Sequence, residues 1–179
     1  MVASGFGAYD LQVYPVAILR NLATAHTATR VVVSFTVQLR GGSYQLSAEP
    51  VSLAPGETLA DTFLCTDACV GATSTDVVVT VGGWVAENRT VISATSASYA
   101  CGSPCSGSTG YQGTVSGSLS GEVTSGALVS LSAVCMDGSG AIVGGGLSQA
   151  LWPPPGPVTV PVLVSTRPAS CQLYASEVG

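Results

Sequence analysis

The sequence predicts an all-β protein built from two antiparallel β-sandwich units, with almost no helix. Hydrophobic and polar residues alternate along several short segments, and no segment shows a convincing 3.6-residue period. Two separate stretches, Arg30 to Leu64 and Ala127 to Val164, share one order of features: an alternating strand, a Gly-rich turn, a second strand, a Pro-Gly turn and a third strand. Each unit contains roughly six or seven short strands, the count expected of a Greek-key sandwich. We therefore expect unit one to span residues 1–86 and unit two to span residues 87–179.

The elements expected in unit one follow from alternation and from turn residues. Leu11 to Leu19 is an opening strand, in which Pro15 marks an edge or a bulge because proline cannot donate a hydrogen bond to a neighbouring strand. Val31 to Arg40 is the clearest strand, since its odd-numbered residues are all apolar. Gly41-Gly42 and Ala54-Pro55-Gly56 supply tight turns. The further expected strands are Ser43 to Leu46, Thr58 to Leu64, and Asp76 to Val81 with its odd-numbered valines facing inward.

The elements expected in unit two repeat this order. The strand from Gly126 to Met136 carries Val129, Leu131, Ala133 and Cys135 on one face, which is typical of a half-buried antiparallel strand. An Asp-Gly-Ser-Gly hairpin turn and a stiff proline-rich turn separate the later strands. The other expected strands are Thr90 to Ala100, Tyr111 to Val123, Ala141 to Gly144, Val158 to Val164 and Cys171 to Val178.

Short motifs in both units are similar to bacterial Ig-like modules of the FxLYD type. These modules have a strand that ends in a Cys-x-Asp segment, a Gly turn, a Val-Val-Gly-like return strand and a Leu-Ala-Pro-Gly-Glu-Thr turn. The matching residues are Val134 to Asp137 with Ile142 to Gly144, and Ser52 to Thr58. Unit one departs from this pattern because it lacks the acidic turn after Leu39, and unit two departs from it by its proline run. The resemblance implies two Ig-like sandwiches and an extracytoplasmic setting, and it implies no activity.

The composition indicates an exported protein. Only 8% of the residues are charged, the net charge is −5, and there is no lysine. Nucleic-acid binding needs clustered cations, and attachment to anionic lipid needs a polybasic segment, so neither partner is expected. No apolar run reaches about 18 residues, so no membrane insertion is expected. Because six cysteines are typical of an oxidising compartment, we expect an extracellular protein whose signal peptide was removed and replaced by Met1.

The six cysteines predict three disulfides. Four of them form two C-x₃-C pairs, Cys65 with Cys69 and Cys101 with Cys105. A zinc site made from these four thiolates is the alternative, but zinc knuckles usually place such ligands closer together. The remaining pair, Cys135 and Cys171, is expected to face the core of unit two and to join two of its strands.

No group of residues predicts catalysis, a metal site or a cofactor. His26 is the only histidine, and no nucleophile motif lies near it. The ten carboxylates are spread singly, so neither a glycosidase pair nor a calcium loop can be assigned. We therefore expect a non-catalytic protein.

Aromatic residues are the remaining candidates for a binding site, because aromatics are enriched at interface hot spots. Several lie near expected strand ends or turns, and the alternative for each is packing into the core. Trp152 precedes three prolines, which hold it rigidly in a loop. Met1 to Ala8 is small, Gly-rich and uncharged, so we expect it to contribute few core positions and to extend into a partner's groove. The residues expected to contact a partner are Phe6, Tyr9, Tyr14 and Trp152. Other aromatics noted near strand ends or between the units are Trp84, Tyr99 and Tyr111.

Together these features predict a secreted adaptor or scaffold that binds other secreted or cell-surface proteins by its loops or by strand addition. In setting and size the chain resembles the small adaptor components of actinobacterial umbrella toxin particles, although no motif is matched. The alternative function is that of a secreted protease inhibitor, which would present the disulfide-closed loop from Cys101 to Cys105.

Overall fold

The computed structural model describes residues 1–86, 90–102, 105, 110–154 and 156–178. These residues form thirteen β-strands and one turn of 3₁₀ helix, Asp67–Cys69, and contain no α-helix. The structure thus confirms the predicted all-β class and the near absence of helix. The strands are β1 (Ala3–Tyr9), β2 (Gln12–Arg20), β3 (Thr27–Leu39), β4 (Gly42–Ser47), β5 (Val51–Leu53), β6 (Thr58–Thr62), β7 (Ala72–Val85), β8 (Ser93–Cys101), β9 (Tyr111–Ser120), β10 (Leu128–Met136), β11 (Ile142–Leu151), β12 (Val158–Val164) and β13 (Ser170–Glu177).

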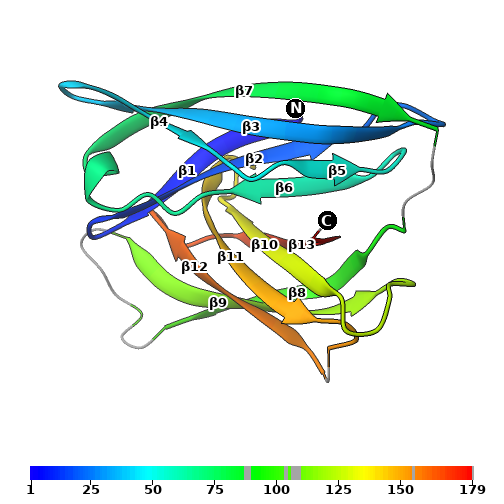
Figure 1. The fold of residues 1–179 in the computed structure, drawn as a ribbon. Helices are drawn as coiled ribbons and strands as arrows, with labels where there is room; N and C mark the ends of the chain where they lie inside the picture. Colours follow the sequence, from blue (N-terminus) through cyan, green and yellow to red (C-terminus); the bar gives the residue numbers. More distant parts are fainter. Residues whose placement is uncertain (87–89, 103–104, 106–109, 155, 179) are drawn as a thin grey trace.

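The strands form three antiparallel sheets that lie one above another (Figure 1). The outer sheet has β3 in the middle, with β7 on one side and β4 and β5 on the other. The middle sheet has the order β1-β2-β6, and the large sheet has the order β13-β10-β11-β12-β9-β8. The first two sheets come from residues 3–85 and the large sheet from residues 93–177. The division into two Ig-like units with a boundary at residues 86 and 87 stays a prediction.

The outer and middle sheets enclose one hydrophobic core. The apolar face of β3 is buried as its alternation predicts, with Val33, Phe35 and Val37 fully inaccessible. These side chains are covered by β2 and β6, whose Ala17, Leu19 and Leu59 belong to the same packed region as most of the β3 face. The expectation for Asp76 to Val81, which lies within β7, was only partly right. Val77 and Val79 are half-buried, but Val81 is 40% exposed.

The large sheet encloses a second core by curling, so that its edge strands β8 and β13 contact each other. The predicted inward face of β10 is confirmed, since Val129, Leu131, Ala133 and Cys135 are all buried in this core. Small residues on β11 allow the close approach of strands that a curled sheet needs. At Gly146, for example, an added Cβ would lie 1.8 Å from the carbonyl oxygen of Pro161 on β12.

The middle sheet is covered on both faces, which explains the continuous apolar run of β2. Ala17 and Leu19 face the outer sheet, whereas Val16 and Ile18 pack with Val134 of the large sheet. The expectation that Pro15 marks an edge or bulge was wrong, because β2 is the central strand and its recorded pairings with β1 and β6 show no bulge there. Proline is tolerated at this position because it lies just past the end of the β2–β6 pairing, where its carbonyl oxygen still accepts hydrogen bonds from Phe63 and Thr62.

The N-terminal segment is part of the fold, contrary to the expectation that Met1 to Ala8 is free to extend. Residues 3–9 form β1, which pairs along its whole length with β2 and contacts β11 and β12 of the large sheet. Its small residues are what make this contact possible. A Cβ at Gly7 would lie 2.4 Å from the Cα of Gly144 and 2.6 Å from the carbonyl oxygen of Leu163. Gly7 therefore lets the backbones of the middle and large sheets touch.

We expect Gly7→Ala to lower the free energy of unfolding by about 2 kcal/mol or more, because the added methyl group meets backbone that cannot rotate away. Chemical denaturation would measure the change. Gly41→Ala is the matched control, since Gly41 has open space around its Cβ position and no left-handed backbone conformation. Equal stability of the two variants would contradict close packing between β1 and the large sheet.

Candidate functional site

The four residues predicted to contact a partner are not brought together by the fold. All four are half-buried. Phe6 on β1 packs against the small cluster around Val13 and the Cys65–Cys69 bridge, and Tyr9 lies at a recess beside Asp67. Tyr14 on β2 is buried enough that desolvation raises the pKa of its phenol. Trp152 is half-buried and packs against the core of the large sheet, and its contact with a partner stays a prediction.

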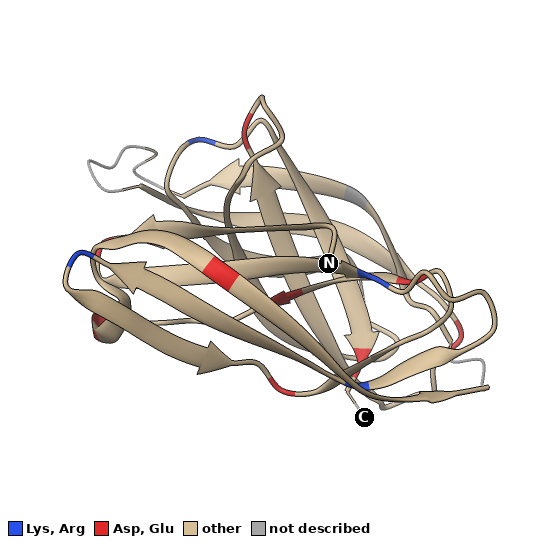
Figure 2. Cartoon of the chain, turned by 90° about the horizontal axis from the view of Figure 1, so that it is seen from above, with Lys and Arg blue, Asp and Glu red and all other residues tan. Residues whose placement is uncertain are grey.

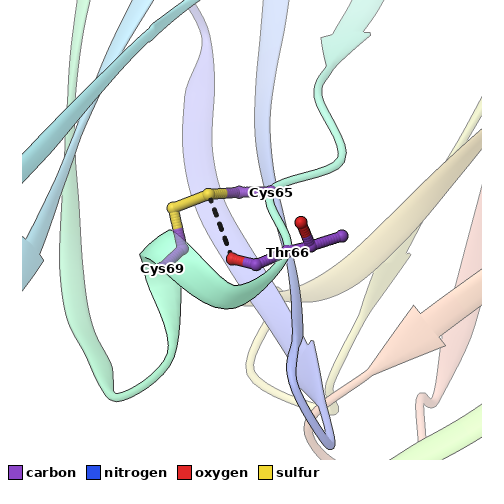
Figure 3. The surroundings of a disulfide bond; sticks show 3 residues. All are labelled: Cys65, Thr66 and Cys69. Carbon is purple, nitrogen blue, oxygen red and sulfur yellow. Dashed lines mark hydrogen bonds between the residues drawn. A yellow bond between two sulfur atoms is a disulfide. The ribbon is translucent and has the colours of Figure 1, made fainter.

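All six cysteines form disulfides, and they join the pairs that the sequence predicts. The bridge between Cys65 and Cys69 spans the 3₁₀ turn that precedes β7, with the Cys65 Sγ 3.6 Å from the carbonyl oxygen of Thr66 (Figure 3). Cys135 and Cys171 are direct partners in the β10–β13 pairing, with their Cα atoms 4.1 Å apart. The bridges therefore stabilise the scaffold, and their sulfur atoms are not available as thiolate ligands.

Charged residues lie singly over the molecule (Figure 2), and no face collects one sign of charge in that view. Among the described residues, no group of three potential metal ligands occurs. None of the described residues belongs to a helix with the length and apolar character needed to span a membrane. His26 is exposed, and the hydrogen bond recorded for it uses its backbone carbonyl, which accepts from the Asn21 side chain.

An apolar groove lies at the open end of the core between the outer and middle sheets, and we call it the Trp84 groove. It encloses about 250 Å³. Its most exposed apolar side chains are Leu22 at 83%, Met1 at 62% and Trp84 at 55%. The charged side chain on its lining is that of Arg20. Its buried floor consists of Leu19, Ala28, Val31 and Leu53.

The loop that presents Leu22 is held by the buried side chain of Asn21. The Asn21 Nδ2 group donates to the carbonyl oxygens of His26 and Leu53, at 2.9 and 3.0 Å. Its Oδ1 accepts a hydrogen bond from the Ala23 backbone at 2.9 Å. Three hydrogen bonds from one side chain fix a short loop firmly, because each satisfies a backbone group that the turn would leave unpaired. Leu22 is thus held outside the core instead of folding over it.

A bulge in β3 lies opposite the part of β7 that carries Trp84. Arg30 has a left-handed backbone conformation with φ 50°, and the pairing of β3 with β5 shifts register between Ala28 and Val31. A bulge of this kind re-aims the side chains that follow it. Ala28 and Val31, three residues apart, are therefore both buried in the same core, and Trp84 pairs with Ala28. Gly82 is required opposite the bulge, since a Cβ there would lie 2.8 Å from the Cβ of Arg30.

The groove adjoins a long free strand edge. Strand β7 has 14 residues and pairs only with β3 among the described strands. Val78 is 63% exposed and Val85 is 40% exposed along this strand. Natural proteins usually protect such edges, so an unprotected apolar edge is a candidate for pairing with another chain.

Sequence reasoning noted Trp84 but did not select it. Strict alternation from Val77, Val79 and Val81 places Trp84 on the opposite face, whereas in the structure it pairs with the buried Ala28 and lines the same groove as Val79 and Val81. The glycine pair Gly82-Gly83 was the available signal, because glycine inside a strand often marks a bulge or a close approach.

Comparisons with known proteins add no functional information. No protein-family model and no curated protein matches this chain. One solved structure, a β-glycosidase from Bacteroides vulgatus, is similar over 94% of this chain at 9% identity, with a TM-score of 0.28. The chain spans 25% of that protein's length.

Proposed function

We propose that this protein is a secreted, non-catalytic adaptor or scaffold that binds other secreted or cell-surface proteins within an extracellular complex. The observation that carries the proposal is the Trp84 groove at the end of the free edge of β7. Trp is the residue type most enriched among interface hot spots, and an exposed Leu beside it enlarges the apolar contact. The resemblance to bacterial Ig-like modules makes a bacterial complex, such as a toxin particle, the setting we favour.

The mode of binding that fits this surface is strand addition with a side-chain anchor. A segment of the partner would pair with β7 through its backbone, because the second side of β7 has no strand partner among the described residues. An apolar side chain of the same segment would enter the Trp84 groove. Export of the protein is supported by its three disulfides, since such bonds persist in oxidising compartments.

We expect Trp84→Ala to weaken capture of the partner by about 30-fold or more, because a half-exposed hot-spot tryptophan contributes roughly 2 kcal/mol or more when it becomes buried in a complex. The measurement is a pull-down from native culture medium with the purified protein as bait, followed by titration of the captured partner. Leu22→Ser should weaken binding in the same direction.

Leu151→Ser is the matched control, because Leu151 is 65% exposed on the large sheet and lies outside the groove. Capture that survives Trp84→Ala and Leu22→Ser would contradict the groove as the binding surface. Capture of a protease, in place of a stoichiometric complex with a non-enzyme, would favour the alternative function of a secreted protease inhibitor. The tip of the inhibitory loop, residues 103 and 104, lies outside the described residues.

A further inference from the structure

A second pocket, which we call the Asp61 pocket, lies between β6 and the large sheet. It encloses about 470 Å³ and is bordered by residues 48–52 on one side and by β10, β11 and β13 on the other. Asp61 is one of its lining residues. Asp61 is only 9% exposed, and its Oδ2 atom has no hydrogen-bond partner. Burial removes the water that would otherwise donate to such an acceptor, and leaving the acceptor without a donor costs free energy. Buried acceptors without a donor are therefore rare.

The strand that carries Asp61 is open on the side of this pocket. Phe63 and Glu57 hydrogen-bond to the β2 side, so by the two-residue alternation of an antiparallel ladder Asp61 does the same. The backbone groups of Ala60 and Thr62 therefore point to the other side of β6, which no described strand covers. An extended chain could lie along this edge and bring a side chain to Asp61.

The lining of the pocket favours a cation. Among the described residues, its ionisable groups are Glu49, Asp61 and Glu177, and no Lys, Arg or His of that part of the chain lines it. Elements β10 and β11 contribute only uncharged groups, among them Ser132 and Gln149. Desolvation by burial raises the pKa of Asp61 to about 6, so the carboxyl is ionised above that pH although no countercharge lines the pocket.

We propose that the Asp61 pocket binds the side chain of an arginine or lysine carried by an extended segment of a protein partner. The inference rests on the proposed function, since it names the chemistry of one contact that the partner makes. The long stem of such a residue fits the apolar walls formed by Val51, Phe63 and Leu147, while its charged head reaches Asp61 and nearby hydroxyl groups. A guanidinium is the better match, because its several donors can serve the carboxylate and Ser132 together.

The test uses a blocked Ala-Arg-Ala tripeptide as the probe and the same peptide with citrulline, an uncharged isostere of arginine, as its control. Binding is followed by amide chemical shifts of the whole protein at about pH 7.5 and at peptide concentrations up to about 20 mM. We expect the arginine peptide to bind at least about tenfold more tightly than the citrulline peptide, because only the cation forms a charge-assisted pair with Asp61.

Asp61→Asn keeps the size of the side chain and removes its charge, and it should abolish this preference. Glu49→Gln at the exposed rim should change the preference by less than Asp61→Asn. Below about pH 5 the preference should also fall, since Asp61 then becomes protonated. Equal binding of the two peptides, an unchanged preference in Asp61→Asn, or no saturable binding of the arginine peptide would overturn the proposal.

This experiment is independent of the native partner, so the two proposals can fail separately. Trp84→Ala should bind the arginine peptide normally, because the Trp84 groove and the Asp61 pocket share no lining residue. A missing partner in the pull-down would count against the adaptor function alone. Loss of the arginine preference would count against the Asp61 pocket alone.

Discussion

Replacing Cys135 and Cys171 together by alanine is expected to lower the free energy of unfolding by about 4 kcal/mol. The bridge spans a sequence separation of 36 residues, so it removes many conformations from the unfolded chain. It also joins two neighbouring strands of the large sheet, and Cys135 is completely buried in that sheet's core. Chemical denaturation of the oxidised protein would measure the loss.

Alanine at Cys101 and Cys105 is the matched control. This bridge spans a separation of only 4 residues, for which the same relation gives about 2 kcal/mol, and neither cysteine is buried. A larger loss from the control than from the Cys135–Cys171 pair would contradict the stabilising role assigned to the long bridge. Thiol titration of the unfolded, oxidised parent protein should find no free thiol, since all six cysteines are paired.

Asp61→Asn is expected to raise the free energy of unfolding by up to about 3 kcal/mol at neutral pH. Burial raises the folded-state pKa of Asp61 from 3.8 to about 6. The folded protein therefore binds a proton more strongly than the unfolded chain does, and its stability falls as pH rises between these two values. The cost is absent below the lower value and complete above the higher one, so the variant should flatten this part of the stability curve.

The control for this prediction is Asp137→Asn, whose effect has the opposite sign. Asp137 accepts hydrogen bonds from the backbone and hydroxyl of Ser139 and from the backbone of Ala141, and these bonds lower the pKa of its exposed carboxyl. Its stabilising effect is present above the unfolded-state pKa and is lost as pH falls, so the variant should be slightly less stable at neutral pH. If Asp61→Asn were the less stable variant at neutral pH, the cost of burying the Asp61 carboxylate would be contradicted.

If the Cys135–Cys171 bridge stabilises the fold and the Asp61 carboxylate destabilises it as expected, the protein keeps a costly carboxylate in its proposed cation pocket. The stability of its scaffold then offsets that cost. Stability lost at Asp61 would be recovered when a cation binds there, since any ligand that prefers the folded state stabilises it. Such a trade between stability and binding is common where a site must stay open until its partner arrives.

The strands that the sequence predicted most clearly are those whose burial follows local alternation. In β3 and β10 one face is apolar and buried, so a period of two residues carries the information. Strand β1 was missed because Ala-Ser-Gly-Phe-Gly-Ala-Tyr shows small residues where an ordinary strand shows large ones. Those residues are small because backbone from the large sheet touches them at Gly7, which is a contact between distant parts of the chain.

By itself, the sequence determined the all-β class, the positions of most strands and turns, and the pairing of the cysteines, because alternation, glycine and proline chemistry, and cysteine spacing are local properties. Only the tertiary structure decided which surfaces are open. Trp84 lies at its groove because it pairs with Ala28 on β3, where Arg30 with its left-handed backbone interrupts the two-residue alternation. Asp61 is buried, with an Oδ2 atom that has no partner, in a pocket that residues 48–52 and strands of the large sheet complete. Exposure and burial depend on what covers a residue, and at these two sites the cover, or its absence, comes from strands far away in the chain.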